Sequence, residues 1–329
     1  MPAWSAELVR LARTGGTETD VIAALNTRGL LARLQDRYAD AITDHEEALA
    51  LAQVVDDRAG RAAALVGLAY NLLFTGDSAR ARELAEQGTV LAREVGSWRS
   101  LGDGLMVLAW HATHAGATER SRELATECLE IYRTLGDTGR IADALRTLGT
   151  SAQLSGQYEE ATRWLREAEQ LLRERGDEHA ADQLLAHLAH TVLGTGDVTK
   201  ARQLAYTALA SAQGYDDLWA TAMAMTIAGH VELVGGDING ARTLFEESRT
   251  LFDRIGSPLY LSWCLEGLAA VALPTARPAA AARLCTEREK LLARLNAQLP
   301  LMHPPSFERT LAAIASPPGK KTGPQVEPD

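Results

Sequence analysis

Residues 137–176 read DTGRIADALRTLGTSAQLSGQYEEATRWLREAEQLLRERG, and they contain two amphipathic segments separated by a glycine turn. The apolar and small residues of each segment recur at the three- and four-residue spacing of an α-helix. Gly156 divides the segments, while Gly136 and Gly176 bound them. Glycine ends a helix by adopting the left-handed conformation, and an Asp or Ser that follows can cap the next helix. The stretch therefore predicts a unit of two helices joined by a turn.

The same unit recurs along the chain with a period of 40 residues. Its central turn falls, without a slip, at Gly76, Gly116, Gly156, Gly196 and Gly236. Extended to Asp36 and Ala276, this ladder defines seven units between Thr17 and Asn296. A fixed period in this range marks stacked repeats. We therefore expect an all-α fold, a solenoid of seven 40-residue helix–turn–helix repeats over residues 17–296.

Two columns of residues support close packing within each unit. The first helix carries a long apolar residue at Leu25, Leu65, Leu105, Leu145, Leu185, Met225 and Leu265. Four residues later comes a small residue, at Gly29, Ala69, Ala109, Gly149, Ala189, Gly229 and Ala269. A small residue lets the partner helix approach, and the long side chain one turn away fills the groove beside it. Asp44 interrupts the apolar column of the second helix, so we expect it to weaken the core of the first unit.

These columns resemble the tetratricopeptide repeat. Unit four carries the pattern in Leu145, Leu148, Gly149, Ala161 and Ala168. The unit is longer than the common repeat of about 34 residues. In this it is similar to the repeats in the C-terminal sensor region of large bacterial ATP-dependent transcriptional activators, of the maltose-activator and antibiotic-regulator type. The resemblance extends to Leu299-Pro300, Pro304-Pro305 and the segment 307–313. It implies a right-handed superhelix, and without a P-loop motif or a helix-turn-helix segment it implies no ATPase or DNA-binding domain.

The ends of the chain depart from the repeat. Residues 1–16 align with the second helix of a unit, so we expect a half-repeat N-terminal cap helix there. Pro300 stops the last repeat helix, and we expect a C-terminal capping helix over residues 297–315. Residues 316–329 lack apolar periodicity and are expected to form a disordered tail.

The first helices are expected to line the concave surface, where such scaffolds usually hold ligands. Two positions of each first helix are expected to point into this groove. One directly follows the residue of the small column, and the other lies one helical turn before that position. We therefore predict that Tyr70, Trp110 and Met106 supply apolar surface for a ligand. We expect Arg146, His190 and His230 to orient a polar or anionic group, and Trp263 to lie in a third groove column. The alternative is that these positions only pack against neighbouring first helices.

The motifs needed for metal or catalytic chemistry are missing from the sequence. His111 with His114, and His187 with His190, are i, i+3 pairs without the further ligands that a zinc site needs. No Gly-x-Ser-x-Gly elbow or complete dinucleotide-binding fingerprint occurs. We therefore assign no catalytic residue, no metal site and no cofactor.

Charge and composition narrow the partners further. The net charge of −10 and the pI near 5.4 argue against direct binding of nucleic acid, which requires a basic face. The opening residues lack the features of a signal peptide, and no apolar run approaches the ~20 residues of a membrane span. We expect a cytoplasmic protein that does not bind membranes.

Together these features favour a non-catalytic tetratricopeptide-like scaffold that binds a protein, a peptide or a small effector in its concave groove. The resemblance places this role in bacterial transcriptional or biosynthetic regulation. The alternative is an enzyme of specialised metabolism that uses the groove as its active site. Self-association through the first repeat stays open as a third interpretation.

Overall fold

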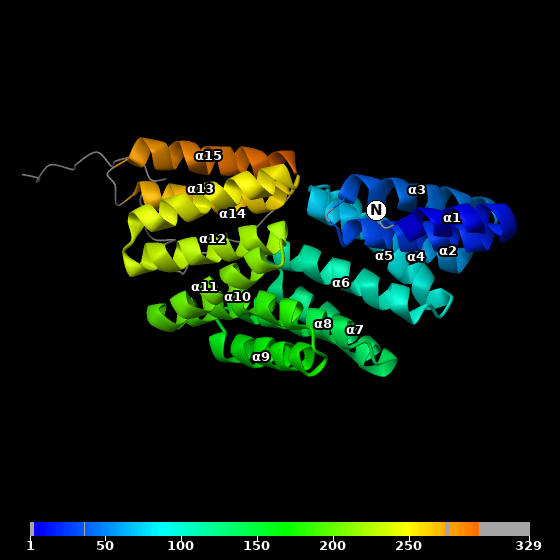
Figure 1. The fold of residues 1–329 in the computed structure, drawn as a ribbon, viewed down its shortest axis with the longest axis horizontal. Coiled ribbons are helices and arrows are strands. Elements are labelled where there is room, and N and C mark those ends of the chain that lie inside the picture. The colour runs from blue at the N-terminus through cyan, green and yellow to red at the C-terminus, as the bar shows by residue number, and fades with distance from the viewer. Residues whose placement is uncertain (1–2, 36, 274–276, 296–329) are drawn as a thin grey trace, which may run out of the picture.

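The computed structural model describes residues 3–35, 37–273 and 277–295, which form a curved stack of α-helices (Figure 1). The helices in these ranges are α1 (Ala3–Gly15), α2 (Glu18–Arg33), α3 (Tyr38–Val54), α4 (Arg58–Thr75), α5 (Ser78–Glu94), α6 (Trp98–His114), α7 (Thr118–Leu135), α8 (Thr138–Leu154), α9 (Tyr158–Glu174), α10 (Glu178–Gly194), α11 (Val198–Gly214), α12 (Leu218–Gly235), α13 (Ile238–Arg254), α14 (Pro258–Ala272) and α15 (Pro278–Arg294). The expected all-α, tetratricopeptide-like solenoid is confirmed. The expected helix over 297–315 and the tail over 316–329 lie outside the described residues.

The helices form two layers. Each even-numbered helix from α2 to α14 packs against the odd-numbered helix that follows it, and those from α2 to α12 also contact the next even-numbered helix. The odd-numbered helices α3 to α15 instead make their main contacts with even-numbered neighbours. The even-numbered layer is therefore the more closely packed of the two, so the stack curves with this layer on its inner side.

Local sequence sets the helix ends. Gly76 ends α4 with φ of 97°, in the left-handed region that glycine enters without steric cost. Aspartate then begins many of the helices, where its carboxylate accepts a hydrogen bond from the backbone N–H three residues later. This cap occurs at Asp57, Asp77, Asp137, Asp177, Asp197, Asp217 and Asp237.

The small column brings paired helices into contact. A Cβ atom on Gly149 would lie 2.7 Å from Leu165 Cγ, and one on Gly229 would lie 2.8 Å from Phe245 Cε1. Real Cβ atoms essentially never come so close to another heavy atom. The side chain of the second helix therefore occupies the space that the glycine leaves.

Asp44, which interrupts the apolar column of the first unit, has a charged partner in the structure. Its side chain is buried, and its two carboxylate oxygens accept hydrogen bonds of 2.9 Å and 2.5 Å from Nε and Nη2 of Arg28. Next to it, the buried ring of His45 fills the space left by Gly29 and Gly67. The pair of Arg28 and Asp44 therefore occupies two positions where most other units have leucine, as at Leu68 and Leu84.

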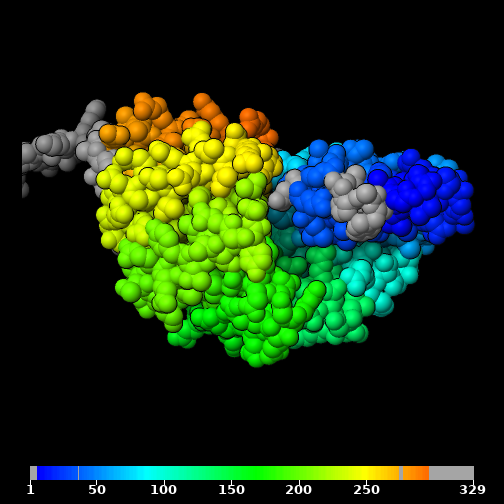
Figure 2. All heavy atoms as spheres, in the orientation of Figure 1, coloured from blue at the N-terminus to red at the C-terminus, as the bar shows by residue number. Residues whose placement is uncertain are grey.

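The two arms of the curve meet at a seam, which we define as Phe74, Gly76, Ser257, Tyr260 and Leu295. Ser257 Oγ donates a hydrogen bond of 3.5 Å to the carbonyl oxygen of Phe74, 183 residues away in sequence. The rings of Phe74 and Tyr260 lie 6.4 Å apart, and a Cβ on Gly76 would lie 2.6 Å from Leu295 Cδ2. Because α4 thus contacts α14, the solenoid closes into a ring (Figure 1), and Figure 2 shows the surfaces of the two arms meeting there.

Of the described helices, α12 alone has a length and an apolar composition that would suffice to span a bilayer. However, 72% of this helix is buried inside the fold, as expected for a core helix.

Candidate functional site

The ring encloses a cavity of about 1230 Å³. Its walls come mainly from the inner helices α2 to α14 and the turns beside them, with single residues or short stretches of α3, α9 and α11, so one space collects side chains from most of the solenoid. Aromatic residues at the cavity are Tyr38, Tyr70, Phe74, Trp110, Tyr215, Trp219, Tyr260 and Trp263. Charged residues and histidines there are Arg33, Arg99, His114, Asp137, Arg140, Asp143, Arg146, Arg175, Asp177, His179, His187, His190, Asp216 and Asp217.

An aromatic cluster connects the cavity wall to the seam. Tyr70 and Trp110 are in edge-to-face contact with ring centroids 5.0 Å apart, and Phe74 lies 5.5 Å from Tyr70 and 5.6 Å from Trp110. Tyr260 approaches the cluster from α14 and contacts Trp263 at 5.0 Å. Aromatic pairs at these distances add to the stability that simple burial gives. The same rings therefore line the cavity and join the arms of the ring.

Trp110 is held in one orientation by the next repeat. Its indole N–H donates a hydrogen bond of 2.8 Å to Thr147 Oγ1 on α8. The Thr147 hydroxyl in turn lies 3.4 Å from Met106 Sδ and 2.9 Å from the carbonyl oxygen of Asp143. Met106 is fully buried and is not among the residues that line the cavity, so it contributes to the packing around Thr147.

One wall carries a charged network from α6 and α8. Arg140 Nη2 lies 2.9 Å from Asp103 Oδ1, and the same oxygen accepts a hydrogen bond of 2.7 Å from the Tyr132 hydroxyl. Arg99 Nη1 pairs with Asp137 Oδ2 at 2.8 Å. Burial, reinforced by the charge of Asp103, raises the pKa of Tyr132 above its ordinary value. Tyr132 therefore serves as a hydrogen-bond donor to the network.

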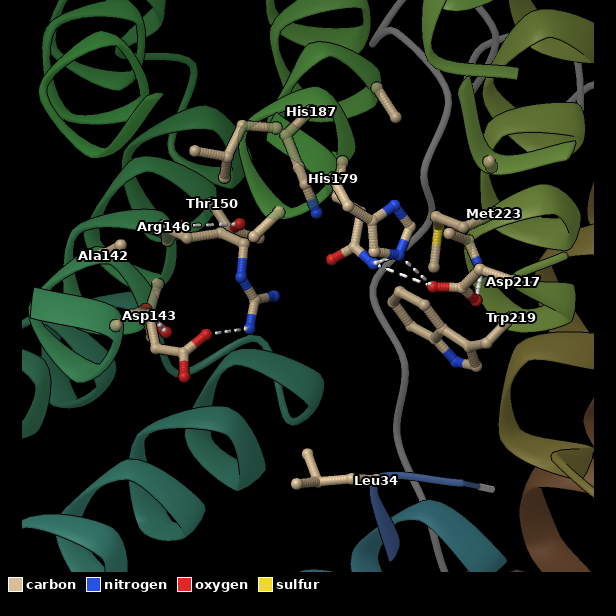
Figure 3. A pocket seen from close by; sticks show the side chains of 18 of the residues that line it. Leu34, Ala142, Asp143, Arg146, Thr150, His179, His187, Asp217, Trp219 and Met223 are labelled. Carbon is tan, nitrogen blue, oxygen red and sulfur yellow. Dashed lines mark hydrogen bonds and ion pairs between the residues drawn. The ribbon is translucent and has the colours of Figure 1, made fainter. Parts of the chain in front are cut away.

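The opposite wall is built around Asp217 (Figure 3). Its Oδ1 accepts a hydrogen bond of 2.8 Å from the Ala220 N–H and so caps α12, while its Oδ2 lies 3.0 Å from His179 Nε2. Gln183 donates a further hydrogen bond of 2.9 Å to the same Oδ2. Figure 3 shows Trp219 beside this carboxylate and Arg146 across the cavity from both, so an acidic and a basic group face each other.

Two histidines at the cavity are held neutral. Burial, together with the charge of Arg146, lowers the pKa of His187 to about 3. Burial also lowers the pKa of His114 to about 4, with His111 and Arg146 as further causes. Both imidazoles are therefore uncharged near neutral pH and add no positive charge to the cavity.

The structure places five of the seven predicted groove residues at the cavity: Tyr70, Trp110, Arg146, His190 and Trp263. The placement of Met106 and His230 in the groove is corrected, because Met106 has 0% and His230 has 1% of its surface exposed. His230 packs between the ring of His190, at 6.3 Å, and that of Phe245, at 5.0 Å. Both side chains are occupied in packing between helices.

The two histidines of the pair His111 and His114 contact different residues. His111 Nδ1 lies 2.8 Å from Ser78 Oγ, whereas the ring of His114 packs edge-on against Tyr260. Among the residues that the structure describes, no group of three His, Cys, Asp or Glu side chains is arranged to hold a metal ion. His190 Nδ1 contacts the Gln153 amide.

Sequence reasoning missed several cavity residues, among them Arg33, Asp217, Trp219 and Tyr260. Arg33 ends α2, and Asp217, Trp219 and Tyr260 lie at or near helix N-termini. The groove columns considered only the middle turns of each inner helix. A signal was present for Asp217, because Asp137, Asp177 and Asp217 stand 40 residues apart.

Comparisons with known proteins agree with the fold. The family model described as tetratricopeptide repeat matches residues 20–94. The regulatory protein AfsR of Streptomyces coelicolor is 34% identical over 96 residues, which are 29% of this chain. The chain spans only 10% of the length of that regulator.

Solved structures of low sequence identity share the architecture. A Rap protein complexed with Competence and Sporulation Factor has a TM-score of 0.70 at 18% identity, covering 89% of this chain and 85% of the other. The Rap conjugation gene regulator of plasmid pLS20 with the Phr* peptide has a TM-score of 0.65 at 13% identity, covering 98% and 83%. A signal-transduction ATPase with a tetratricopeptide repeat sensor, from Pyrococcus horikoshii, has a TM-score of 0.56 at 15% identity, covering 94% and 45%.

Proposed function

We propose that this chain is a regulatory sensor that binds a short peptide or small effector inside its ring. The single observation that carries the proposal is the cavity of about 1230 Å³, lined along its whole length by aromatic and charged side chains. Pockets for drug-sized ligands occupy roughly 300–1,000 Å³ and combine apolar walls with a few polar groups. This cavity has that composition and more room, which suits an extended ligand.

The comparisons support a regulatory role. Two of the similar structures are complexes of Rap proteins, one with Competence and Sporulation Factor and one with the Phr* peptide, and AfsR is a regulatory protein. We propose that the bound ligand changes how the outer surface meets a protein partner in bacterial transcriptional or biosynthetic control, from a cytoplasmic location. An enzyme would need an acid–base pair at the cavity, for example Asp143 with His190. This alternative has less support, because Asp143 already lies 3.3 Å from Arg146.

The test is to fill the cavity. Thr150 lies at the cavity on α8, and Thr150→Trp would place an indole there, whereas Thr207→Trp adds the same group to the exposed face of α11. Both full-length variants and the parent chain would be incubated with a pool of short random peptides, and retained peptides identified by mass spectrometry after ultrafiltration. We expect the parent chain and Thr207→Trp to retain peptides and Thr150→Trp to retain few. Retention that is equal in all three proteins would contradict the proposal.

A further inference from the structure

Two arginines stack on the aromatic pair of the cavity wall. The Arg33 guanidinium lies 3.9 Å from the ring centre of Tyr70, and that of Arg146 lies 5.2 Å from the ring centre of Trp110. Since Tyr70 and Trp110 are themselves in contact, the four side chains form one continuous stack, and all of them line the cavity. Stacking fixes the plane of each guanidinium and leaves its N–H edges available.

The charges of these two arginines are only weakly compensated. Arg33 forms no ion pair with any residue that the structure describes. Arg146 has one carboxylate neighbour, Asp143 Oδ1 at 3.3 Å, and the other oxygen of Asp143 lies 3.5 Å from Arg140. By contrast, Arg99 and Arg140 have carboxylate partners at 2.8 Å and 2.9 Å. The stack therefore leaves positive charge facing the cavity.

The surroundings of Arg146 strengthen this conclusion. Its guanidinium projects into the cavity between Asp143 and Thr150 (Figure 3). The charge of Arg146 also affects two other residues at the cavity. Burial lowers the pKa of His187, and Arg146 adds to this effect. Burial raises the pKa of Tyr260, and Arg146 opposes this rise. A partly buried cation attracts an anion more strongly than one fully surrounded by water, because the effective dielectric constant near protein is lower.

We propose that Arg33 and Arg146, stacked on Tyr70 and Trp110, form a subsite for a carboxylate of the bound ligand. The proposal rests on the function proposed above and specifies which group of the ligand is recognised. A planar carboxylate matches the planar donor edge of a guanidinium, and charge-assisted hydrogen bonds of this kind are roughly twice as strong as neutral ones. The carboxylate has two sources in a peptide, the free C-terminus and an Asp or Glu side chain.

The experiment uses the full-length chain and two pools of short random peptides, one with free C-terminal carboxylates and one with C-terminal amides. We expect stronger retention of the free-acid pool if the C-terminus is bound. If an acidic side chain is bound, we expect both pools to be retained and their retained members to be enriched in Asp and Glu. In either case Arg33→Gln and Arg146→Gln should each weaken retention about tenfold or more, because a hydrogen bond to a charged group contributes about 1.5–3 kcal/mol. Arg146→Lys, which keeps the charge without the planar edge, should restore part of the loss.

One variant serves as the control. Arg163 also stacks on an indole, 4.8 Å from the ring centre of Trp164, but it does not line the cavity. Arg163→Gln should retain peptides like the parent chain, and circular dichroism would confirm that all variants are folded.

The outcomes separate the two proposals. Peptides retained by the parent chain, but equally by Arg33→Gln and Arg146→Gln and without preference for acidic groups, would overturn the carboxylate subsite and leave the cavity as a peptide site. Failure of the parent chain to retain either pool would overturn the proposed function itself, and the subsite with it.

Discussion

Trp110 shows how one side chain can serve both packing and recognition. With 9% of its surface exposed, it contacts Tyr70 and Phe74, donates to Thr147, and presents one face to Arg146 in the cavity. The opposing interpretations of this position, groove residue or packing residue, therefore do not exclude each other. A ligand that meets Trp110 meets a ring already fixed by the core, so little side-chain entropy remains to be lost on binding.

The hydrogen bond between Trp110 and Thr147 gives the first prediction. Trp110→Phe and Thr147→Val should each lower the free energy of unfolding by about 1 kcal/mol, because each removes one partner of a buried hydrogen bond. In the double variant the loss should be clearly smaller than the sum, since both changes remove the same bond. Urea unfolding of the four proteins measures this coupling. Fully additive losses would show that the bond contributes nothing.

Three histidines with lowered pKa values predict acid sensitivity. The pKa values of His45 and His114 are lowered to about 4 and that of His187 to about 3, mainly by burial, from 6.5 in the unfolded chain. As the pH falls below 6.5, the unfolded state binds protons that the folded state does not, so stability present above pH 6.5 is lost progressively. At pH 5 each histidine should cost about 2 kcal/mol relative to pH 7. Thermal unfolding across this range should show a falling Tm, with a shallower slope for His187→Gln; a flat profile would contradict the assignment.

The register of the repeat predicted which columns approach the cavity, but not how far each inner helix is rotated. Of the residues in those columns, Tyr70, Trp110, Arg146 and His190 line the cavity. His230 does not, because its ring packs against Phe245 and His190, whereas Trp219 and Met223 of the same helix line the cavity. The register of the repeat could not predict Arg33, because the last turn of α2 lies outside the repeating columns.

At the scale of the helix, the local sequence was sufficient to predict where helices begin and end. The glycine that ends a helix and the aspartate that begins the next one recur at fixed positions, and each satisfies backbone groups that would otherwise lack a partner. Because these choices are made within a few residues, the alternation of helices and turns could be predicted from the sequence. Asp44 is the exception, since its pairing with Arg28 depends on a contact between two helices.

Helix capping gives the next prediction. Asp237 accepts a hydrogen bond of 2.9 Å from the Gly240 N–H at the start of α13. Asp237→Ala should lower the free energy of unfolding by about 1 kcal/mol, and Asp237→Asn should retain most of it. Asp253→Ala makes the same change in charge near the other end of α13, where a negative charge opposes the helix dipole, and should cost little or nothing. Equal losses at both positions, measured by chemical denaturation, would argue against a capping role.

At the scale of the whole molecule, ring closure was not predictable. Each repeat contacts its neighbours, so the sequence determines the angle between adjacent units only approximately. Errors in this angle accumulate from α4 to α14, and Phe74 and Ser257 meet across 183 residues. The seam is therefore a property of the summed curvature, and no single repeat carries a signal for it.

Two glycines allow the seam to be tested. Gly76 and Gly116 both have positive φ, of 97° and 71°, so an alanine at either position costs roughly 1–2 kcal/mol of backbone strain. Only Gly76 touches the opposite arm, whereas a Cβ on Gly116 would meet nothing within 4 Å. We expect Gly76→Ala, but not Gly116→Ala, to increase the radius of gyration in small-angle X-ray scattering. The same radius for both variants would mean that the seam does not hold the arms together.

A linear array of repeats frays from its ends, because a terminal unit has a single neighbour. In this protein the seam gives α14, in the last repeat, a further neighbour in α4. Their amide hydrogens should therefore exchange with deuterium nearly as slowly as those of α8 in the middle of the chain, while α1, which lies beyond the seam, should exchange first. In Gly76→Ala the protection of α4 and α14 should fall while that of α8 is retained. The order of exchange would thus follow position in the ring, and not distance from the chain ends.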